Sequence, residues 1–509
     1  MEHYIEVLSD RSSVLIAIII IPTTIFIVSH LLSSGAAQFP LLGGELGNSE
    51  KRRKAFFAGA AALYDQGYAA FRDKPFRLTT VDGERIVVPT SALDELRRLP
   101  DETISNKEAL NKTVENRYTG LHADNKLLNH IIRADLTRNL SRLNPRLGEE
   151  VARTVDEVLG PCEDWTRVTI HQKFLRIVAI VSGQIFLGPE LCRKEEYLYA
   201  SINYTVDVFA AIRKLKAWHH LLRPVAQYFI PEIKTLNEHR IKAREFLLPI
   251  IKERKAAAAA GQELPDDMLQ WMINKADEFQ FSDQELADTQ LTLSLAAIHT
   301  TSATATDILS ELVVRPEVVE ELRGEIKEVL QRHDGVIHTQ TLFEMKLLDS
   351  VMREAQRVSP FNQARFSRYV SKPVTLSNGI HLPAGYTIES PHGPVMRDTA
   401  IYPDADKFDA HRFADLRAAR VPDPVNYKSR EQYQFVSVTK ENMSFGFGAH
   451  ACPGRFFAAN EIKLILSRLL LQYDLRLPEG TQIPPRLIAG AQSQANPKLQ
   501  IELRKVQTA

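Results

Sequence analysis

The chain has 509 residues, of which 44% are hydrophobic and 25% are charged, values typical of a globular protein with a large core. Lys plus Arg and Asp plus Glu both number 63, so the net charge is zero and no polyanionic partner such as a nucleic acid is indicated. The cysteines at positions 162, 192 and 452 are too few for a disulfide framework and indicate a reducing compartment that faces the cytosol.

The first predicted element is a membrane anchor. No Asp, Glu, Lys or Arg occurs between Arg11 and Glu45, and residues 14–32 form a nearly continuous aliphatic run that is long enough to cross a bilayer. The alternative is a cleaved signal peptide, although the leader before this run is acidic rather than basic. A basic cluster at residues 51–54 follows, and the positive-inside rule then directs the rest of the chain to the cytosol.

The next segments predict a β-hairpin followed by a long helical region. Residues 76–89 alternate apolar and polar side chains around Asp82-Gly83, a sequence typical of a tight hairpin turn. From about residue 91 onward, apolar residues recur three and four positions apart, which predicts helices. Residues 212–230 combine basic and aromatic side chains, and they suit either a membrane interface or an ordinary surface helix.

The longest predicted helix begins at Ser282. Ser282 and Glu285 have the spacing of a capping box, and no proline or glycine follows until Pro316. This pattern predicts a helix of about 32 residues, on the order of 50 Å long at about 1.5 Å per residue. We expect such a long, apolar helix to pass through the centre of a domain. Its middle reads Ala296-Ala297-Ile298-His299-Thr300-Thr301.

Charged residues after this helix are candidates for supporting a site. Glu354 and Arg357 are three positions apart on another predicted helix, so they share one face and can form two parallel hydrogen bonds. Pairs of this kind are common on surfaces and indicate no function alone. Arg365 and Arg368 follow, ahead of short strands predicted at residues 374–376 and 386–389.

A glycine-rich loop near the C-terminus contains Cys452. Glycines at positions 446, 448 and 454 permit turns and close approaches of the backbone. Pro453 and the apolar periodic run after it predict that Cys452 stands at or just before a helix N-terminus, where the helix dipole favours the thiolate. The residues alone leave three interpretations open: a ligand to a soft metal, a nucleophile with His450 as its base, or a buried structural cysteine.

The longer pattern around Cys452 is more specific. Residues 445–454 read Phe-x-x-Gly-x-His-x-Cys-x-Gly, which resembles the heme-binding loop of the cytochrome P450 family, the heme-thiolate monooxygenases. The resemblance implies that Cys452 supplies the axial thiolate ligand of the iron in heme b, where its charge favours O–O cleavage. It also implies that His450 donates to a heme propionate and that Phe445 belongs to the cofactor-binding loop.

The middle of the long helix resembles the oxygen-activating segment of the same family, Ala/Gly-Gly-x-Asp/Glu-Thr-Thr. The resemblance places Thr300 where a hydroxyl bonds iron-bound dioxygen and helps to deliver protons; the alternative is a threonine that only bonds the carbonyl four residues earlier. Two residues depart from the family pattern, because Ala297 replaces a glycine and His299 replaces the acid. His299 either shuttles protons itself, since imidazole titrates near neutrality, or has a structural role.

Further motifs of the family occur in the expected order. Glu354 and Arg357 resemble its Glu-x-x-Arg, and Arg412 matches the arginine that completes this buried triad, which braces the heme pocket.

For the family's propionate-binding arginines, the sequence offers more than one candidate or only a partial match. Arg368 is the better match and Arg365 the second, with a solvated pair of basic residues as the alternative. The family's Trp-x-x-x-Arg is matched only by Asn129 and Arg133, so Arg133 is either a heme contact or part of a solvated helix face.

The resemblance implies a single, mainly α cytochrome P450 fold with a small β region, preceded by one N-terminal transmembrane helix. The expected divisions are a luminal N-terminus at 1–13, a transmembrane anchor at 14–32, a hinge with a basic stop-transfer segment at 33–54, and a heme-thiolate catalytic domain at 55–509. The protein is then expected in the endoplasmic reticulum membrane, in contact with membrane lipid, with this domain facing the cytosol.

The implied reaction is insertion of one oxygen atom from O2 into a small apolar substrate, with electrons from NADPH-cytochrome P450 reductase. The sequence has no G-x-G-x-x-G motif at a strand–helix junction, so we do not expect the chain to bind NADPH itself. The segment around Thr300 resembles that of fungal members that oxidise terpenoids and indole-derived secondary metabolites. The alternatives are a heme-thiolate isomerase or dehydratase that acts on a peroxide, which Thr300 disfavours, and a non-catalytic heme-binding protein.

Overall fold

The computed structural model describes residues 34–122 and 124–506. The predicted luminal segment at 1–13 and the predicted anchor at 14–32 lie outside these residues. Within the described ranges, none of the helices combines the length and the apolar character needed to cross a bilayer.

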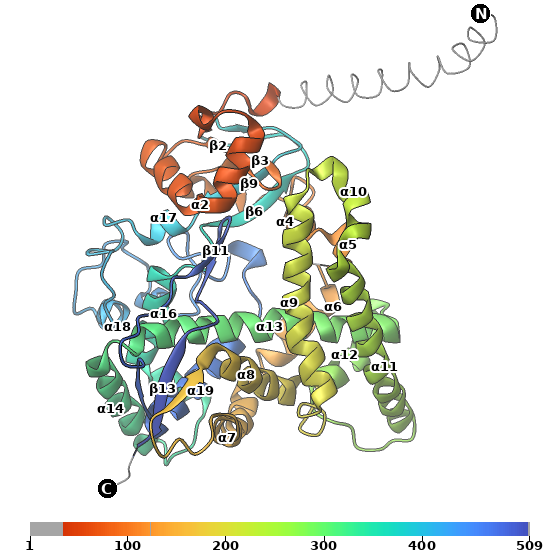
Figure 1. The fold of residues 1–509 in the computed structure, drawn as a ribbon, viewed down its shortest axis with the longest axis vertical. Coiled ribbons are helices and arrows are strands. Elements are labelled where there is room, and N and C mark those ends of the chain that lie inside the picture. Colours follow the sequence, from red (N-terminus) through yellow and green to blue (C-terminus); the bar gives the residue numbers. More distant parts are fainter. Residues whose placement is uncertain (1–33, 123, 507–509) are drawn as a thin grey trace, which may run out of the picture.

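Helices make up most of the described chain, as the mainly α prediction required (Figure 1). The longer helices are α2 (Ser49–Ala70), α7 (Leu140–Leu159), α8 (Ile170–Phe186), α9 (Glu195–Ala217), α11 (Pro231–Ala259), α12 (Met268–Phe279), α13 (Asp283–Leu312), α14 (Pro316–Arg332), α16 (Lys346–Val358) and α19 (Arg455–Gln472). The shorter ones are α3 (Leu93–Leu96), α4 (Asn106–Thr113), α5 (Asn116–Thr119), α6 (Lys126–Ile131), α10 (Arg223–Ala226), α15 (Thr339–Glu344), α17 (Gly393–Met396) and α18 (Arg412–Arg417).

Small β-sheets complete the fold. A six-stranded sheet has the order β1-β2-β3-β9-β6-β4, built from β1 (Leu41–Leu42), β2 (Phe76–Thr80), β3 (Gly83–Val87), β9 (Thr387–Pro391), β6 (Ala364–Val370) and β4 (Ile104–Ser105). A second sheet has the order β10 (Tyr473–Arg476), β13 (Gln500–Lys505) and β5 (Thr166–Thr169). Two-stranded pairs are formed by β7 (Val374–Thr375) with β8 (His381–Leu382) and by β11 (Leu487–Ala489) with β12 (Gln492–Gln494).

The predicted hairpin and the predicted long helix are both confirmed. Strands β2 and β3 pair antiparallel on either side of the turn that contains Asp82. Helix α13 begins with the expected capping box, in which the Ser282 hydroxyl accepts from the Glu285 amide at 3.3 Å. The Glu285 carboxylate accepts in return from the Ser282 amide at 2.8 Å. These two bonds satisfy backbone donors that the first turn of a helix leaves free.

Helix α13 crosses the middle of the molecule (Figure 1) and packs against α8, α9, α11 and α16. The largest hydrophobic cluster joins α7, α8, α13, α16 and α19 around it. Helix α2 begins at Ser49, before the predicted domain boundary at residue 55, so the basic cluster at 51–54 occupies its first turns. There the Arg52 guanidinium donates to the Thr79 hydroxyl on β2 at 2.8 Å.

Candidate functional site

The loop that carries Cys452 is shaped by its glycines. Gly446 and Gly448 have φ angles of 84° and 74°, a left-handed conformation that favours glycine. The loop closes where the Cys452 amide donates to the Phe445 carbonyl at 2.7 Å. Helix α19 begins directly afterwards at Arg455, which confirms the predicted position of Cys452 just before a helix.

Cys452 is the exposed cysteine of the described chain, whereas Cys162 and Cys192 are buried. Protein atoms packed around the Cys452 thiol raise its pKa, because desolvation disfavours the thiolate. Backbone N–H groups of Gly454 and Arg455 and the charge of the Arg455 guanidinium act in the opposite direction and lower it. These groups stabilise negative charge on the sulfur, as a thiolate ligand to a metal requires.

Thr300 lies on an exposed face in the middle of α13. Thr300 and Ala296, one helical turn apart, are both exposed although α13 crosses the middle of the molecule, so space opens along this face. The Thr300 hydroxyl donates to the Ala296 carbonyl at 2.7 Å. This is the local contact expected of a helical threonine. The hydroxyl oxygen keeps its capacity to accept a hydrogen bond from a group in this space.

His299 faces away from that space. Its Nε2 lies 2.8 Å from the Ile202 carbonyl on α9, so Nε2 carries the proton and donates. Burial lowers the pKa of His299, and the carbonyl contact opposes this shift. Consecutive helical residues are about 100° apart around the axis. The structure therefore places the imidazole in the interface between α9 and α13, and a role in proton transfer stays a prediction.

A second histidine lies near His299 on α8. His171 Nδ1 is 3.1 Å from the Thr306 hydroxyl of α13. Burial, together with a smaller effect of the nearby His299, lowers the pKa of His171 to about 4. Both imidazoles are thus held neutral near pH 7 in the packing around α13. This pair had no signal in the sequence, because α8 and α13 are more than a hundred residues apart.

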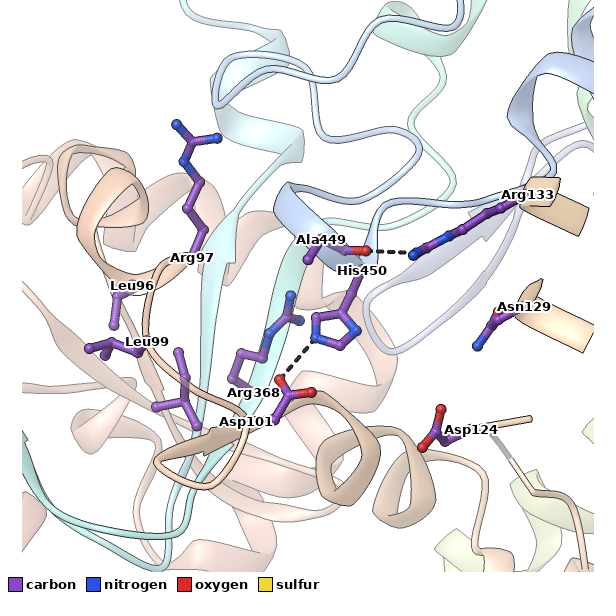
Figure 2. A pocket seen from close by; sticks show the side chains of 11 residues that line it. Leu96, Arg97, Leu99, Asp101, Asp124, Asn129, Arg133, Arg368, Ala449 and His450 are labelled. Carbon is purple, nitrogen blue, oxygen red and sulfur yellow. Dashed lines mark hydrogen bonds and ion pairs between the residues drawn. The ribbon is translucent and has the colours of Figure 1, made fainter. Parts of the chain in front are cut away.

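A pocket of about 390 Å³ brings together the three predicted propionate-binding residues Arg133, Arg368 and His450 (Figure 2). His450 Nε2 lies 2.9 Å from the Asp101 carboxylate, and the Arg133 guanidinium donates to the Ala449 carbonyl at 2.8 Å. The other residues lining the pocket are Leu96, Arg97, Leu99, Asp101, Ile104, Asp124, Asn129 and Ala449. A concentration of cationic side chains of this kind suits a ligand that carries carboxylates.

Arg368 is the most buried of these three residues. Its guanidinium donates to the Asn106 side-chain oxygen at 2.7 Å and to the Ser367 carbonyl at 2.8 Å. Burial lowers the pKa of Arg368 to about 10, and the charge of Asp101 opposes this. Arg97 and Asp101, which also line the pocket, were missed by the sequence interpretation because they belong to an unremarkable charged segment.

An irregularity in β6 sets the direction of two arginines. Arg365 pairs with Ser390 of β9 and Arg368 pairs with Ile388, so three steps along β6 correspond to two along β9. The extra residue is a β-bulge, and Phe366 within it has a φ of 57°. Because Ser390 and Ile388 lie on one face of β9, Arg365 and Arg368 share that face of the sheet as well.

Arg365 is close enough to Cys452 for their charges to interact. Burial lowers the pKa of Arg365 to about 10, and the sulfur partly offsets this effect. The imidazole of His392 is also close and is fully buried. Burial holds the pKa of His392 well below its usual value, and the charges of Arg365 and Arg397 lower it further. His392 is therefore neutral and supplies no counter-charge to Arg365.

The predicted triad of Glu354, Arg357 and Arg412 is confirmed. The Arg357 guanidinium donates two hydrogen bonds of 2.8 Å to the Glu354 carboxylate. Arg412 Nε donates to the same carboxylate at 3.1 and 3.2 Å. The Glu354 and Arg357 side chains are almost wholly buried. Arg357 also donates to the carbonyls of Met396 and Ala405, so the triad ties α16 to the segments before α18.

Phe445 joins the Cys452 loop to the packed interior. Its ring meets the buried ring of Phe435 edge-on, with centroids 5.3 Å apart. On the outer side of the loop, Arg455 donates to the Cys452 carbonyl at 2.8 Å. Arg455 was not among the predicted site residues, although its position three residues after Cys452 was a signal that could have identified it.

Comparisons with known proteins agree with this arrangement. The family model described as cytochrome P450 matches residues 102–503. The cytochrome P450 monooxygenase braC of Annulohypoxylon truncatum is 37% identical over 471 residues, which cover 91% of this chain and 92% of that protein. The cytochrome P450 monooxygenase AN1598 of Emericella nidulans is 32% identical over 505 residues, 97% of this chain and 93% of that protein.

The fold also resembles a solved structure, that of retinoic-acid-bound cyanobacterial CYP120A1. The TM-score is 0.64 at 19% sequence identity, and the match covers 87% of this chain and 93% of the other.

Proposed function

Because this chain belongs to the cytochrome P450 family of monooxygenases, we propose that it inserts one oxygen atom from O2 into an apolar organic substrate, with electrons supplied by NADPH-cytochrome P450 reductase. The observation that carries this proposal is the pairing of two features. The exposed Cys452 stands in a loop with backbone donors at its sulfur, and the hydroxyl of Thr300 borders open space in the middle of α13.

The residues present fit heme b. Cys452 would ligate the iron, while Arg368, Arg133 and His450, which converge on one pocket, would hold the two propionates. When bound, heme supplies the redox chemistry that activates O2, which no amino-acid side chain supplies by itself. The protein's own contribution would be to stabilise the thiolate charge at the sulfur.

Thr300 would supply a positioned proton at the oxygen site. Its hydroxyl can accept a hydrogen bond from a group on the open side of α13 while it donates to the Ala296 carbonyl. After rotation of the O–H bond, it can donate to that group instead. His299 immediately precedes Thr300, but its side chain contacts the Ile202 carbonyl on α9. Any effect of His299 on Thr300 would therefore be transmitted through the backbone of α13 rather than by direct contact.

We expect Thr300→Ala to uncouple electron consumption from product formation. General acid–base assistance is worth about 10²–10⁴-fold in rate, so product formed per NADPH should fall strongly and hydrogen peroxide should rise. Thr300→Ser, which keeps the hydroxyl, should restore much of the coupling. The measurement is the ratio of product to NADPH, normalised to thiolate-ligated heme.

Variants at two other positions of α13 provide a control for this result and a test of His299. Thr292→Ala removes the same kind of contact from α13, a hydroxyl bond of 2.9 Å to the Asp288 carbonyl, and should leave coupling unchanged. If His299 relays protons, His299→Ala should uncouple as Thr300→Ala does, and His299→Asp should recover part of the coupling. A folded His299→Ala protein with normal coupling would remove this histidine from the relay.

The substrate is proposed to be a fungal secondary metabolite of terpenoid or indole-derived type. The support is similarity to fungal monooxygenases, including adrA of Penicillium rubens, which is 33% identical over 94% of this chain and 93% of that protein. A screen of metabolites for shifts in the heme spin state would identify the substrate class directly.

The reductase is proposed to dock on the outer side of the Cys452 loop. A pocket of about 450 Å³ lies there, lined by Arg97, Arg98, Val438, Phe447, Gly448, Ala449, Ala451 and Arg455. Among the described residues that line it, three are arginines and none is acidic. A positive, concave surface over the electron-accepting side suits an acidic partner.

We also propose that the protein is anchored in the endoplasmic reticulum membrane through residues 14–32, with the folded body in the cytosol. Support comes from the connection after α9, where large apolar side chains are exposed. Tyr228 is 82% exposed and Phe229 is 75% exposed, and Trp218, Leu221, Leu222 and Val225 extend this surface. It lies at the end of the molecule that also holds β2 and β3 (Figure 1), the strands next to the first described residues.

The anchor predicts a specific fractionation result. Full-length protein should stay with microsomes during alkaline carbonate extraction, because about 20 apolar residues in a bilayer are not released by salt or pH. Added protease should digest the folded body in intact microsomes, since it faces the cytosol. Release of most of the protein by carbonate, or protection from protease, would contradict the proposed topology.

A further inference from the structure

Arg365 is a cation without a partner beside the Cys452 loop. Its Nε is shielded from solvent and has no hydrogen-bond partner. Among the residues that the structure describes, no carboxylate forms an ion pair with its guanidinium, and its main charged neighbour is the Cys452 sulfur. Removing a guanidinium from water without a counter-charge is strongly unfavourable. The remaining guanidinium nitrogens have no hydrogen bond or ion pair within the described chain and are free to bind an anion.

The direction of Arg365 is set by the bulge in β6. Arg365 and Arg368 lie on the same face of the sheet, and Arg368 reaches the pocket that also holds Arg133 and His450. Arg365 is not among the residues that line this pocket. It stands three positions earlier in β6, where its charge interacts with that of the Cys452 sulfur.

Because Arg365 does not line the propionate pocket, an anion bound to Arg365 would be distinct from the heme propionates. Three basic residues already converge on the propionate pocket: Arg133, Arg368 and His450. A carboxylate bound at Arg365 would lie outside that group. The remaining occupant of the cavity is the substrate.

We propose that Arg365 binds a carboxylate group of the substrate, so that the substrate is an organic acid with an apolar body. This inference rests on the proposed function, since it assigns the substrate class of the same cavity. The planar guanidinium can form two parallel hydrogen bonds with a carboxylate, which fixes the orientation of the acid as well as its affinity.

The test uses ω-imidazolyl alkanoic acids of increasing chain length, each compared with its own methyl ester. The imidazole binds the heme iron and reports through the Soret band, so binding does not depend on knowing the natural substrate. At the chain length that reaches Arg365, wild-type protein should prefer the acid by about 10- to 100-fold, the value of a charge-assisted hydrogen bond. Arg365→Gln should bind acid and ester equally, and Arg365→Lys should keep part of the preference.

Arg397→Gln is the matched control. Arg397 is the other cation near His392, and its guanidinium already pairs with Asp65 at 2.6 Å, so the preference for the acid should persist in this variant. The thiolate band of the reduced carbon monoxide complex is recorded for every protein. Its absence from wild-type protein would count against the proposed function and not against the role of Arg365.

Two results would overturn the inference. One is equal affinity of the wild-type protein for acids and esters at every chain length, or an undiminished preference in Arg365→Gln. The other is faster transfer of heme from Arg365→Gln to apomyoglobin with an unchanged acid preference, which would assign Arg365 to a propionate. If Arg365→Gln does not fold, Arg365→Lys is the deciding variant. An undiminished preference of this variant for the acid over the ester would contradict recognition by two parallel hydrogen bonds from a guanidinium.

Discussion

Cys452→Ala is expected to lose both the red-shifted Soret band of the reduced carbon monoxide complex and all monooxygenase activity. The physical reason is that no other side chain near the loop can replace the thiolate charge, since Cys162 and Cys192 are buried elsewhere. The measurement is the reduced carbon monoxide difference spectrum, together with heme content per protein.

Cys162→Ala is the control for this experiment. Cys162 is a buried cysteine whose thiol contacts the Leu159 carbonyl at 3.3 Å, so its removal should leave the spectrum unchanged. If Cys452→Ala kept the red-shifted band and its activity, the axial ligand would have to be a different residue.

Glu354→Ala is expected to prevent accumulation of folded, heme-loaded protein. The Glu354 carboxylate is fully buried and accepts hydrogen bonds from Arg357, from Arg412 and from the Asp409 amide. Its removal leaves two buried guanidinium groups without their anion. Breaking a buried pair in this way costs about 3–5 kcal/mol, a large part of the roughly 5–15 kcal/mol that stabilises a domain.

The measurement is the free energy of unfolding in urea, or the yield of soluble heme protein where unfolding cannot be followed. Glu278→Ala is the matched control, because Glu278 forms an ion pair with Lys275 at the same sequence spacing on a solvent-exposed face. Exposed pairs contribute about 0–1 kcal/mol, so this variant should unfold like the wild type. Similar stability of the Glu354 and Glu278 variants would show that the triad does not brace the fold.

The features predicted from sequence are those with local causes. The start of α13 followed from Ser282 and Glu285, which bond each other's backbone three residues apart. The β2–β3 hairpin followed from Asp82-Gly83. The loop around Cys452 followed from glycines that permit its left-handed turns. In each example the residues that determine the conformation are close neighbours in the chain.

Partners that meet only in the folded chain were not predictable. Asp101 pairs with His450 across more than three hundred residues, and no local pattern marks it. The bulge at Phe366 depends on how β6 pairs with β9, and it decides which face Arg365 takes. Strand β5 pairs with β13 although more than three hundred residues separate them in the chain. Such pairings depend on the tertiary arrangement, which single-sequence patterns do not encode.

The hydrogen bond between His299 and the Ile202 carbonyl links motion of α9 to the turn of α13 that carries Thr300. A ligand that displaces α9 on entry must break this bond or move that turn. At about 1 kcal/mol for such a bond, its loss would disfavour a displaced α9 by about fivefold. Thermodynamic linkage is reciprocal. A ligand that moved α9 would therefore shift the conformation of the Thr300 turn, and a change in that turn would alter the affinity for the ligand.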